Sequence, residues 1–140
     1  MNEYSESTLV EQPAIELFQS LGYEHQNCFT EKFGDSGTLG RETPSDVVLI
    51  PRLKSALFRL NPDMPEETIA LAIEELCRDR SSQNPVIANR ELYRMLKDGV
   101  KVHVRKEDGS EEIETVKVID FDNPETNDFF FSVLGYRRDV

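Results

Sequence analysis

VKVHVRKEDGSEEIETVKVIDF, residues 100–121, is the stretch that sets the fold class of this chain. Apolar and polar residues alternate in VKVHVR (100–105) and again in IETVKVIDF (113–121), and this period of two is typical of half-buried strands. Between them, KEDGS contains Asp108 and Gly109, a pair that suits the positive φ angles of a tight hairpin turn. The stretch therefore predicts an antiparallel β-hairpin.

Three helices are predicted before the hairpin, at about Asp46–Leu60, Pro65–Asp79 and Pro85–Lys97. Each has a proline near its start and polar residues or glycine after its end, which is the usual asymmetry of helix boundaries. Pro51 is expected to break or restart the first of them. The middle segment has the clearest apolar stripe, formed by Ile69, Ala72, Ile73 and Leu76.

A further helix is predicted near the amino terminus, because apolar residues recur there at spacings of three and four up to Gly22. The stripe consists of Val10, Ala14, Leu17, Phe18 and Leu21. Thr8 and Glu11 fit the Thr-x-x-Glu capping box, although Pro13 is tolerated only in the first turn and leaves the start open by about one turn.

Two less regular segments complete the chain. Residues 25–44 contain three glycines and no sustained period, so we expect a loop with one short strand near Cys28–Phe33. DFFFSVLGY, residues 128–136, is expected to be a final strand. Helices followed by a hairpin and one more strand make a mixed α/β fold.

The composition limits the classes of protein to which the chain can belong. With 140 residues, a single domain can bury roughly two thirds of the surface that its unfolded form exposes. The formal net charge of -11 speaks against a broad basic face that holds DNA by itself. No apolar run reaches the ~18 residues of a membrane span, and the acidic start MNEYSESTLVEQ is unlike a signal peptide. A cytoplasmic protein without membrane contact is expected.

Few residues offer recognisable chemistry. Cys28 and Cys77 lack the spacing of a disulfide framework or a zinc site, and both are expected to be reduced and partly buried. His25 and His103 are expected to be surface residues and not ligands or bases. Phosphate-binding loops, nucleophile elbows and His-Glu-x-x-His helices are missing from the sequence, so catalysis would depend on carboxylates.

Four phrases together resemble the amino-terminal part of the R subunit of type I restriction enzymes. They are STLVEQPAIELFQSLGYE, LGRETPSDVVLIPRLKSALFRLNP, NPVIANRELYRMLKDGVKV and VIDFDNPETNDF, in that order. The resemblance implies a subunit several times longer, with a PD-(D/E)xK nuclease domain, two RecA-like motor lobes that hydrolyse ATP, and a helical region that docks on the methyltransferase core. Residues 1–140 are expected to form the amino-terminal portion of the nuclease domain, an incomplete restriction-endonuclease-like domain.

The resemblance implies that Glu11 and Asp139 are catalytic residues. Nucleases of this type use carboxylates to hold Mg²⁺, which activates water. Family members contribute a glutamate from the first helix, which Glu11 resembles; on helical spacing it can reach inward, whereas Glu16 points away. From the residues alone, the favoured alternative is that Glu11 completes a capping box with Thr8; with the family pattern the two interpretations are equal.

Asp139 lies in GYRRDV, residues 135–140, which resembles the segment that carries the family's metal-binding aspartate. The spacing from NDFFF to RRDV is shorter than the family's, and a terminal charge without a role is the alternative. The Glu-x-Lys of the next strand does not follow Val140, so the chain alone is expected to be inactive. Mg²⁺ for the complete nuclease and ATP for the motor lobes are the cofactors implied.

Asp120 and Asp122 form a second acidic pair, in VIDFDNP. Two carboxylates at i and i+2 of a strand share one face and can hold a metal. The favoured alternative is that they end a strand, with NPETN as the turn that follows.

The predicted function is that of an amino-terminal fragment of the DNA-cleaving, ATP-dependent translocating subunit of a type I restriction-modification system, which contributes to cleavage of foreign unmethylated DNA. Its expected partners are DNA, the methyltransferase and specificity subunits and, through the open sheet edge at FFFSVL, a second copy of the chain. The alternative is a non-catalytic module that binds and modulates the restriction complex. An acidic DNA mimic is disfavoured because arginines and lysines interrupt the acids.

Overall fold

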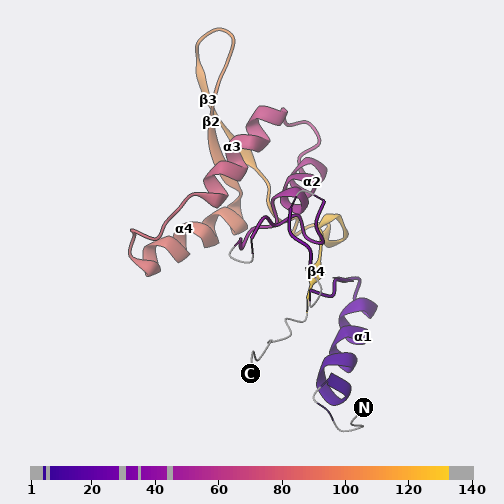
Figure 1. The fold of residues 1–140 in the computed structure, drawn as a ribbon. Helices are drawn as coiled ribbons and strands as arrows, with labels where there is room; N and C mark the ends of the chain where they lie inside the picture. Colours follow the sequence, from indigo (N-terminus) through magenta and orange to yellow (C-terminus); the bar gives the residue numbers. More distant parts are fainter. Residues whose placement is uncertain (1–4, 6, 29–30, 35, 44–45, 133–140) are drawn as a thin grey trace.

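The computed structural model describes residues 5, 7–28, 31–34, 36–43 and 46–132, and it has a mixed α/β fold, as predicted (Figure 1). Two short strands, β1 and β4, pair in parallel, and β2 and β3 form an antiparallel hairpin. The elements are η1 (Ser7–Glu11), α1 (Gln12–Ser20), β1 (Glu24–His25), α2 (Ile50–Leu60), α3 (Glu66–Cys77), α4 (Pro85–Asp98), β2 (Val100–Arg105), β3 (Glu111–Val116), η2 (Pro124–Thr126) and β4 (Phe130–Phe131).

The predicted hairpin is confirmed, with Val100 opposite Val116 and Arg105 opposite Glu111. Its tip extends away from the helices (Figure 1). Gly109 has a φ of 83°, and the Asp108 carboxylate accepts a hydrogen bond of 2.9 Å from the amide of Ser110. The turn therefore lies where the Asp-Gly pair predicts it, and Gly109 supplies its positive φ, whereas Asp108 has none.

The second strand is shorter than predicted, since residues 117–121 are not in the sheet. The buried side chain of Asn61 explains why β3 ends at Val116. Its amide nitrogen donates to the carbonyl of Lys117 at 2.8 Å, and its carbonyl oxygen accepts from the amide of Lys117 at 2.8 Å. One side chain thus satisfies both backbone groups of Lys117 and replaces a ladder partner.

The three central helices agree with the prediction except at one start. α2 begins at Ile50 and not at Asp46, because Pro51 fits the first turn, where its missing N–H is not needed. The Asn84 side chain caps α4 by accepting from the amide of Val86 at 2.9 Å. α4 ends at Gly99, whose φ is 89°. None of the helices that the structure describes has the length and apolar character needed to cross a membrane.

The aliphatic core lies between α2, α3 and one face of the hairpin. Its most enclosed members, Leu57, Ile69 and Val100, are 0% exposed. Burial of such side chains stabilises a fold by roughly 1.5–3 kcal/mol each. The complete set of buried residues in this cluster is Leu57, Ile69, Ala72, Val100, Val102 and Val116.

The amino-terminal helix lies apart from this core, and α1 contains no buried residue (Figure 1). The predicted capping box is wrong, because Thr8 lies inside the π-helical turn η1 and Glu11 itself precedes α1 with helical dihedrals. Pro13 explains the irregular start. It has no N–H to donate to the carbonyl of Leu9, so a regular α-helical ladder cannot extend back through this turn.

The parallel pair β1–β4 joins the two ends of the described chain. Glu24 is opposite Phe130, and the amide of Glu24 donates to the carbonyl of Phe129 at 2.8 Å. The strand predicted near Cys28–Phe33 does not occur in the described residues 28 and 31–33, and residues 29 and 30 lie outside the described part. The strand that the structure has in this region is β1, which comes earlier. Of the predicted strand 128–136, the structure has Phe130–Phe131 as β4, and residues 133–136 lie outside the described part.

Candidate functional site

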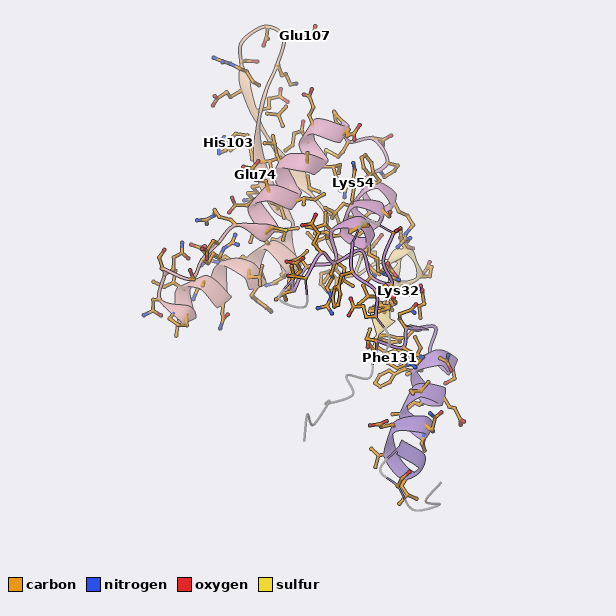
Figure 2. All side chains as sticks on the ribbon, in the orientation of Figure 1. Lys32, Lys54, Glu74, His103, Glu107 and Phe131 are labelled. Atoms are coloured by element: carbon orange, nitrogen blue, oxygen red, sulfur yellow. The ribbon has the colours of Figure 1, made fainter. Side chains whose placement is uncertain are left out.

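An aromatic cluster surrounds the β1–β4 pair. We define it as Phe18, Tyr23, His25, Phe129 and Phe131. The ring of Phe131 lies 5.1 Å from that of Phe18 and 5.0 Å from that of His25, between centroids, and Figure 2 shows it beside α1. Such offset and edge-on contacts stabilise aromatic pairs beyond the area they bury. This cluster attaches α1, which directly follows the turn that carries Glu11, to β1 and β4.

His25 belongs to this cluster, which corrects the prediction that it is a surface residue. It is half-buried in β1, where its ring packs on Phe131. His103 agrees with the prediction: it is exposed on β2, opposite Ile113 (Figure 2).

Arg52, in the first turn of α2, connects the aromatic cluster with the helical part of the protein. Its guanidinium donates to Glu24 at 2.9 and 3.3 Å and to Asp128 at 2.7 and 3.1 Å. Its central carbon also lies 4.4 Å from the centroid of the Phe130 ring. Planar bidentate geometry and stacking on an aromatic face are properties of arginine that lysine does not share. One side chain thereby holds β1 and the approach to β4 against α2.

Arg52 and Glu24 change each other's pKa. Hydrogen bonds from Arg52 and, secondly, its positive charge hold the pKa of Glu24 below the ordinary value of 4.5. The pKa of Arg52 is raised, chiefly by its hydrogen bonds to Glu24, so its charge is permanent. Because the pKa of Glu24 is lower in the folded state, the stabilisation is present above the ordinary pKa and is lost as the pH falls through the folded value.

Replacement of Arg52 by methionine tests this connection. We expect Arg52→Met to lower the free energy of unfolding by about 1–2 kcal/mol at neutral pH, because two partly exposed ion pairs and a cation–π contact are lost. The difference from the unaltered chain should shrink as the pH falls from the ordinary value of 4.5 through the lower folded-state pKa of Glu24, where the folded carboxylate becomes protonated.

Urea unfolding at several pH values measures both effects. Arg105→Met is the matched control, since Arg105 is exposed and its side chain has no ion pair among the described residues. Equal destabilisation by the two variants, or a difference that does not change with pH, would contradict the assignment.

Glu11, one of the two predicted catalytic residues, is half-buried at the end of η1. Its carboxylate has no hydrogen-bond or ion-pair partner among the described residues, so no internal contact occupies it. Asp139, the second predicted catalytic residue and the predicted metal ligand, lies outside the described residues. Whether the two carboxylates meet therefore stays a prediction.

The turn interpretation of Asp120 and Asp122 is confirmed. The carboxylate of Asp120 accepts from the amides of Asp122 and Asn123 at 3.1 and 3.0 Å, an Asx turn that leads into η2. The hydrogen bond from the amide of Asn123 is the main cause of the lowered pKa of Asp120. Nowhere in the described residues do three histidine, cysteine, aspartate or glutamate side chains gather closely enough to hold a metal.

Neither cysteine forms a disulfide, in agreement with the prediction. Cys28 is half-buried, as expected, and its thiol donates to the carbonyl of Gln26 at 3.8 Å. Cys77 is exposed at the end of α3, which corrects the expectation that it is partly buried.

Comparison with known proteins identifies the family. Residues 3–133 match the family model of the type I restriction enzyme R protein N terminus. The chain belongs to this family. It is 29% identical over 125 residues to the type I restriction enzyme HindI endonuclease subunit of Haemophilus influenzae, covering 86% of this chain and 11% of that protein. It is 31% identical over 127 residues to the putative type I restriction enzyme MjaIXP endonuclease subunit of Methanocaldococcus jannaschii, covering 89% of this chain and 12% of that protein.

The match confirms the resemblance that the sequence phrases indicate, and it covers nearly the whole chain. The chain spans only about an eighth to a ninth of the length of these relatives. No solved structure matches it significantly.

The Arg52 connection is the part of this R-protein N terminus that sequence reasoning missed. Arg52 is one of many basic residues there, and its partners Glu24 and Asp128 lie 28 and 76 positions away. In the sequence, the only local indication of this contact is that Glu24 and Asp128 each have aromatic neighbours, in YEH and NDFFF. A periodicity argument compares residues within one element and has no means of pairing these three.

Proposed function

We propose that this chain is the amino-terminal part of the DNA-cleaving subunit of a type I restriction-modification system and contributes to endonucleolytic cleavage of foreign unmethylated DNA. The observation that carries the proposal is the family match over residues 3–133. The two relatives, whose names describe endonuclease subunits of type I restriction enzymes, support it.

In this proposal Glu11 and Asp139 are catalytic carboxylates, and Asp139 is a metal ligand. The carboxylate of Glu11 has no partner among the described residues, which supports its role, since an internal ion pair would have to be broken before it could act. Arg52 and the aromatic cluster would hold α1, β1 and β4 in a fixed arrangement, which favours a constant distance between the two segments that carry these acids.

The described residues do not by themselves form a magnesium site, because no cluster of ligating side chains occurs among them. We propose Mg²⁺ as a cofactor of the complete nuclease, with Asp139 among its ligands, and ATP as the cofactor of motor lobes elsewhere in the subunit. Magnesium would supply water activation there. The proposed partners are DNA, the methyltransferase and specificity subunits and, through the edge at FFFSVL, a second copy of the chain, all in the cytoplasm.

The test compares this chain with a complete subunit that carries it at the amino terminus. Each is assembled with the methyltransferase and specificity subunits and given Mg²⁺, ATP and unmethylated plasmid. We expect cleavage by the complete subunit and none by the 140 residues, because these residues contain no Glu-x-Lys.

Cleavage is measured as conversion of supercoiled to linear plasmid. A Glu11→Gln chain purified in parallel controls for contaminating nuclease. Cutting by the 140-residue chain but not by this variant, or no cutting by the complete subunit, would overturn the proposal.

A further inference from the structure

A row of four cations runs along α4 and into β2. We call Arg90, Arg94, Lys97 and Lys101 the basic row. All four side chains are exposed, and none has a hydrogen bond or an ion pair with another described residue. α4 lies at the edge of the molecule, with one side away from the other helices (Figure 1). The row is therefore open to a partner.

The spacing of the row follows from the helix. Arg90, Arg94 and Lys97 are separated by four and then three positions, so they lie on one face of α4 and span about 10 Å along its axis. Lys101 extends the row past Gly99 and lines the same pocket as Arg94. One strand of duplex DNA presents a phosphate about every 3.4 Å of helix axis, so the helical part of the row spans about three of them.

Two of the acids nearest to the row, Glu75 and Glu91, are already neutralised. Glu75 pairs with Arg78 at 3.3 Å and Arg80 at 3.1 Å, and Glu91 pairs with the same two arginines at 3.4 Å each. The side chain of Arg80 is 10% exposed, so this network is partly desolvated and persistent. Of the acids that line this pocket, Asp98 alone has no such pair among the described residues. Acids without an ion pair in the described part of the chain also border the end of the row, where Glu74 lines a pocket with Lys101 and Asp122 lines one with Lys97.

Most other cations among the described residues form an ion pair or a hydrogen bond through their side chains, whereas the four of the row do not. The arginines and lysines whose side chains form an ion pair or a hydrogen bond are Arg41, Arg52, Lys54, Arg59, Arg78, Arg80 and Lys106. The net charge of -11 repels a polyanion in general, but screening limits its reach to about 10 Å at ~0.1 M salt. Exposed cations of the row can therefore attract a polyanion at short range, although the net charge of the whole protein repels it.

We propose that the basic row of α4 and β2 binds the phosphate backbone of duplex DNA, independently of sequence. This inference rests on the proposed function, because it assigns to one surface the contact with the DNA that the complete subunit cleaves. Contacts to phosphate fix the position of a protein on the duplex and carry no base specificity.

The test measures binding of a short fluorescent duplex to the 140-residue chain by anisotropy, in EDTA and over a range of low salt concentrations. The row variant is Arg94→Gln with Lys97→Gln. The control is Arg105→Gln with Lys32→Gln, which removes the same charges at exposed positions away from α4; Lys32 is labelled in Figure 2. Glutamine is a good helix former, so the row variant should keep α4, which circular dichroism checks.

We expect the row variant to bind DNA about tenfold more weakly or worse, and its slope of log affinity against log salt to become shallower by about 1.8, which corresponds to two lost phosphate contacts. The control should change affinity by less than about threefold. Absence of binding by the unaltered chain, equal weakening by both variants, or an unchanged salt slope would overturn the inference. So would a row variant that loses affinity for the methyltransferase–specificity complex but not for DNA, because the row would then face a protein.

The outcome is separate from that of the proposed function, since binding is measured without Mg²⁺. If the basic row does not bind DNA, the proposed function can still be tested by cleavage with the complete subunit and its Glu11 variant. A complete subunit that does not cleave would overturn the proposed function and leave the measured DNA contact of α4 in place.

Discussion

Replacement of Glu11 by glutamine in a complete subunit that carries this sequence should reduce DNA cleavage by at least roughly 100-fold, as expected for loss of a carboxylate that acts directly in the reaction. Glutamine keeps the size of the side chain and removes its charge. Because the carboxylate has no partner among the described residues, the substitution breaks no internal contact that the structure describes. The loss should therefore appear in activity and not in the free energy of unfolding.

Glu16→Gln is the matched control for this experiment. Glu16 is exposed on α1, five positions from Glu11, and its replacement changes the net charge by the same amount. We expect near-normal cleavage from it, and ATP hydrolysis unaffected in both variants. Normal cleavage by the Glu11 variant would remove Glu11 from the active site, and equal loss in both variants would indicate an effect of charge and not of position.

Leu57→Ala should have the largest effect on stability, lowering the free energy of unfolding by about 3–4 kcal/mol. Leu57 is 0% exposed where α2 meets α3 and the hairpin. Truncation removes apolar contacts and leaves a cavity that elements on three sides cannot close. A loss of this size is a large fraction of the 5–15 kcal/mol that is usual for a domain.

Urea unfolding of the 140-residue chain measures this loss, with Leu71→Ala as the control. Leu71 lies on α3 and is 40% exposed, so the same chemical change should cost less than about 1 kcal/mol. Similar losses from both variants would mean that the cluster around Leu57 is not the centre of the fold.

Elements whose signals are local could be predicted from the sequence. The hairpin follows from alternation and Asp108-Gly109, and α3 and α4 follow from an apolar stripe and from Asn84 and Gly99 at the ends of α4. The end of the second hairpin strand was predicted wrongly because a side chain distant in the sequence determines it. β3 ends early because Asn61, on another element, takes both backbone groups of Lys117. No pattern within residues 113–121 contains that information.

The candidate site could be predicted only in part, for the same reason. Glu11 and Asp139 came from the resemblance to a family, since a carboxylate on a helix has many ordinary uses. The short parallel pair β1–β4 is not predicted because two-residue strands have no measurable period; the predicted strand lies near Cys28–Phe33, whereas the structure has Glu24–His25 as β1. Arg52 was missed because its role exists only after both strands have been placed beside α2.

The β1–β4 pairing also has a consequence for synthesis on the ribosome. Glu24 and Phe130 are 106 positions apart, so at translation rates of about 5–20 residues per second β1 waits about 5–20 s for its partner strand. The aliphatic core needs only residues 57 to 116 and can form during that interval. The nascent chain therefore exposes the aromatic rings of α1 and β1 to chaperones until β4 has been made, and the aromatic cluster with the β1–β4 pair is the last described part of this segment to assemble.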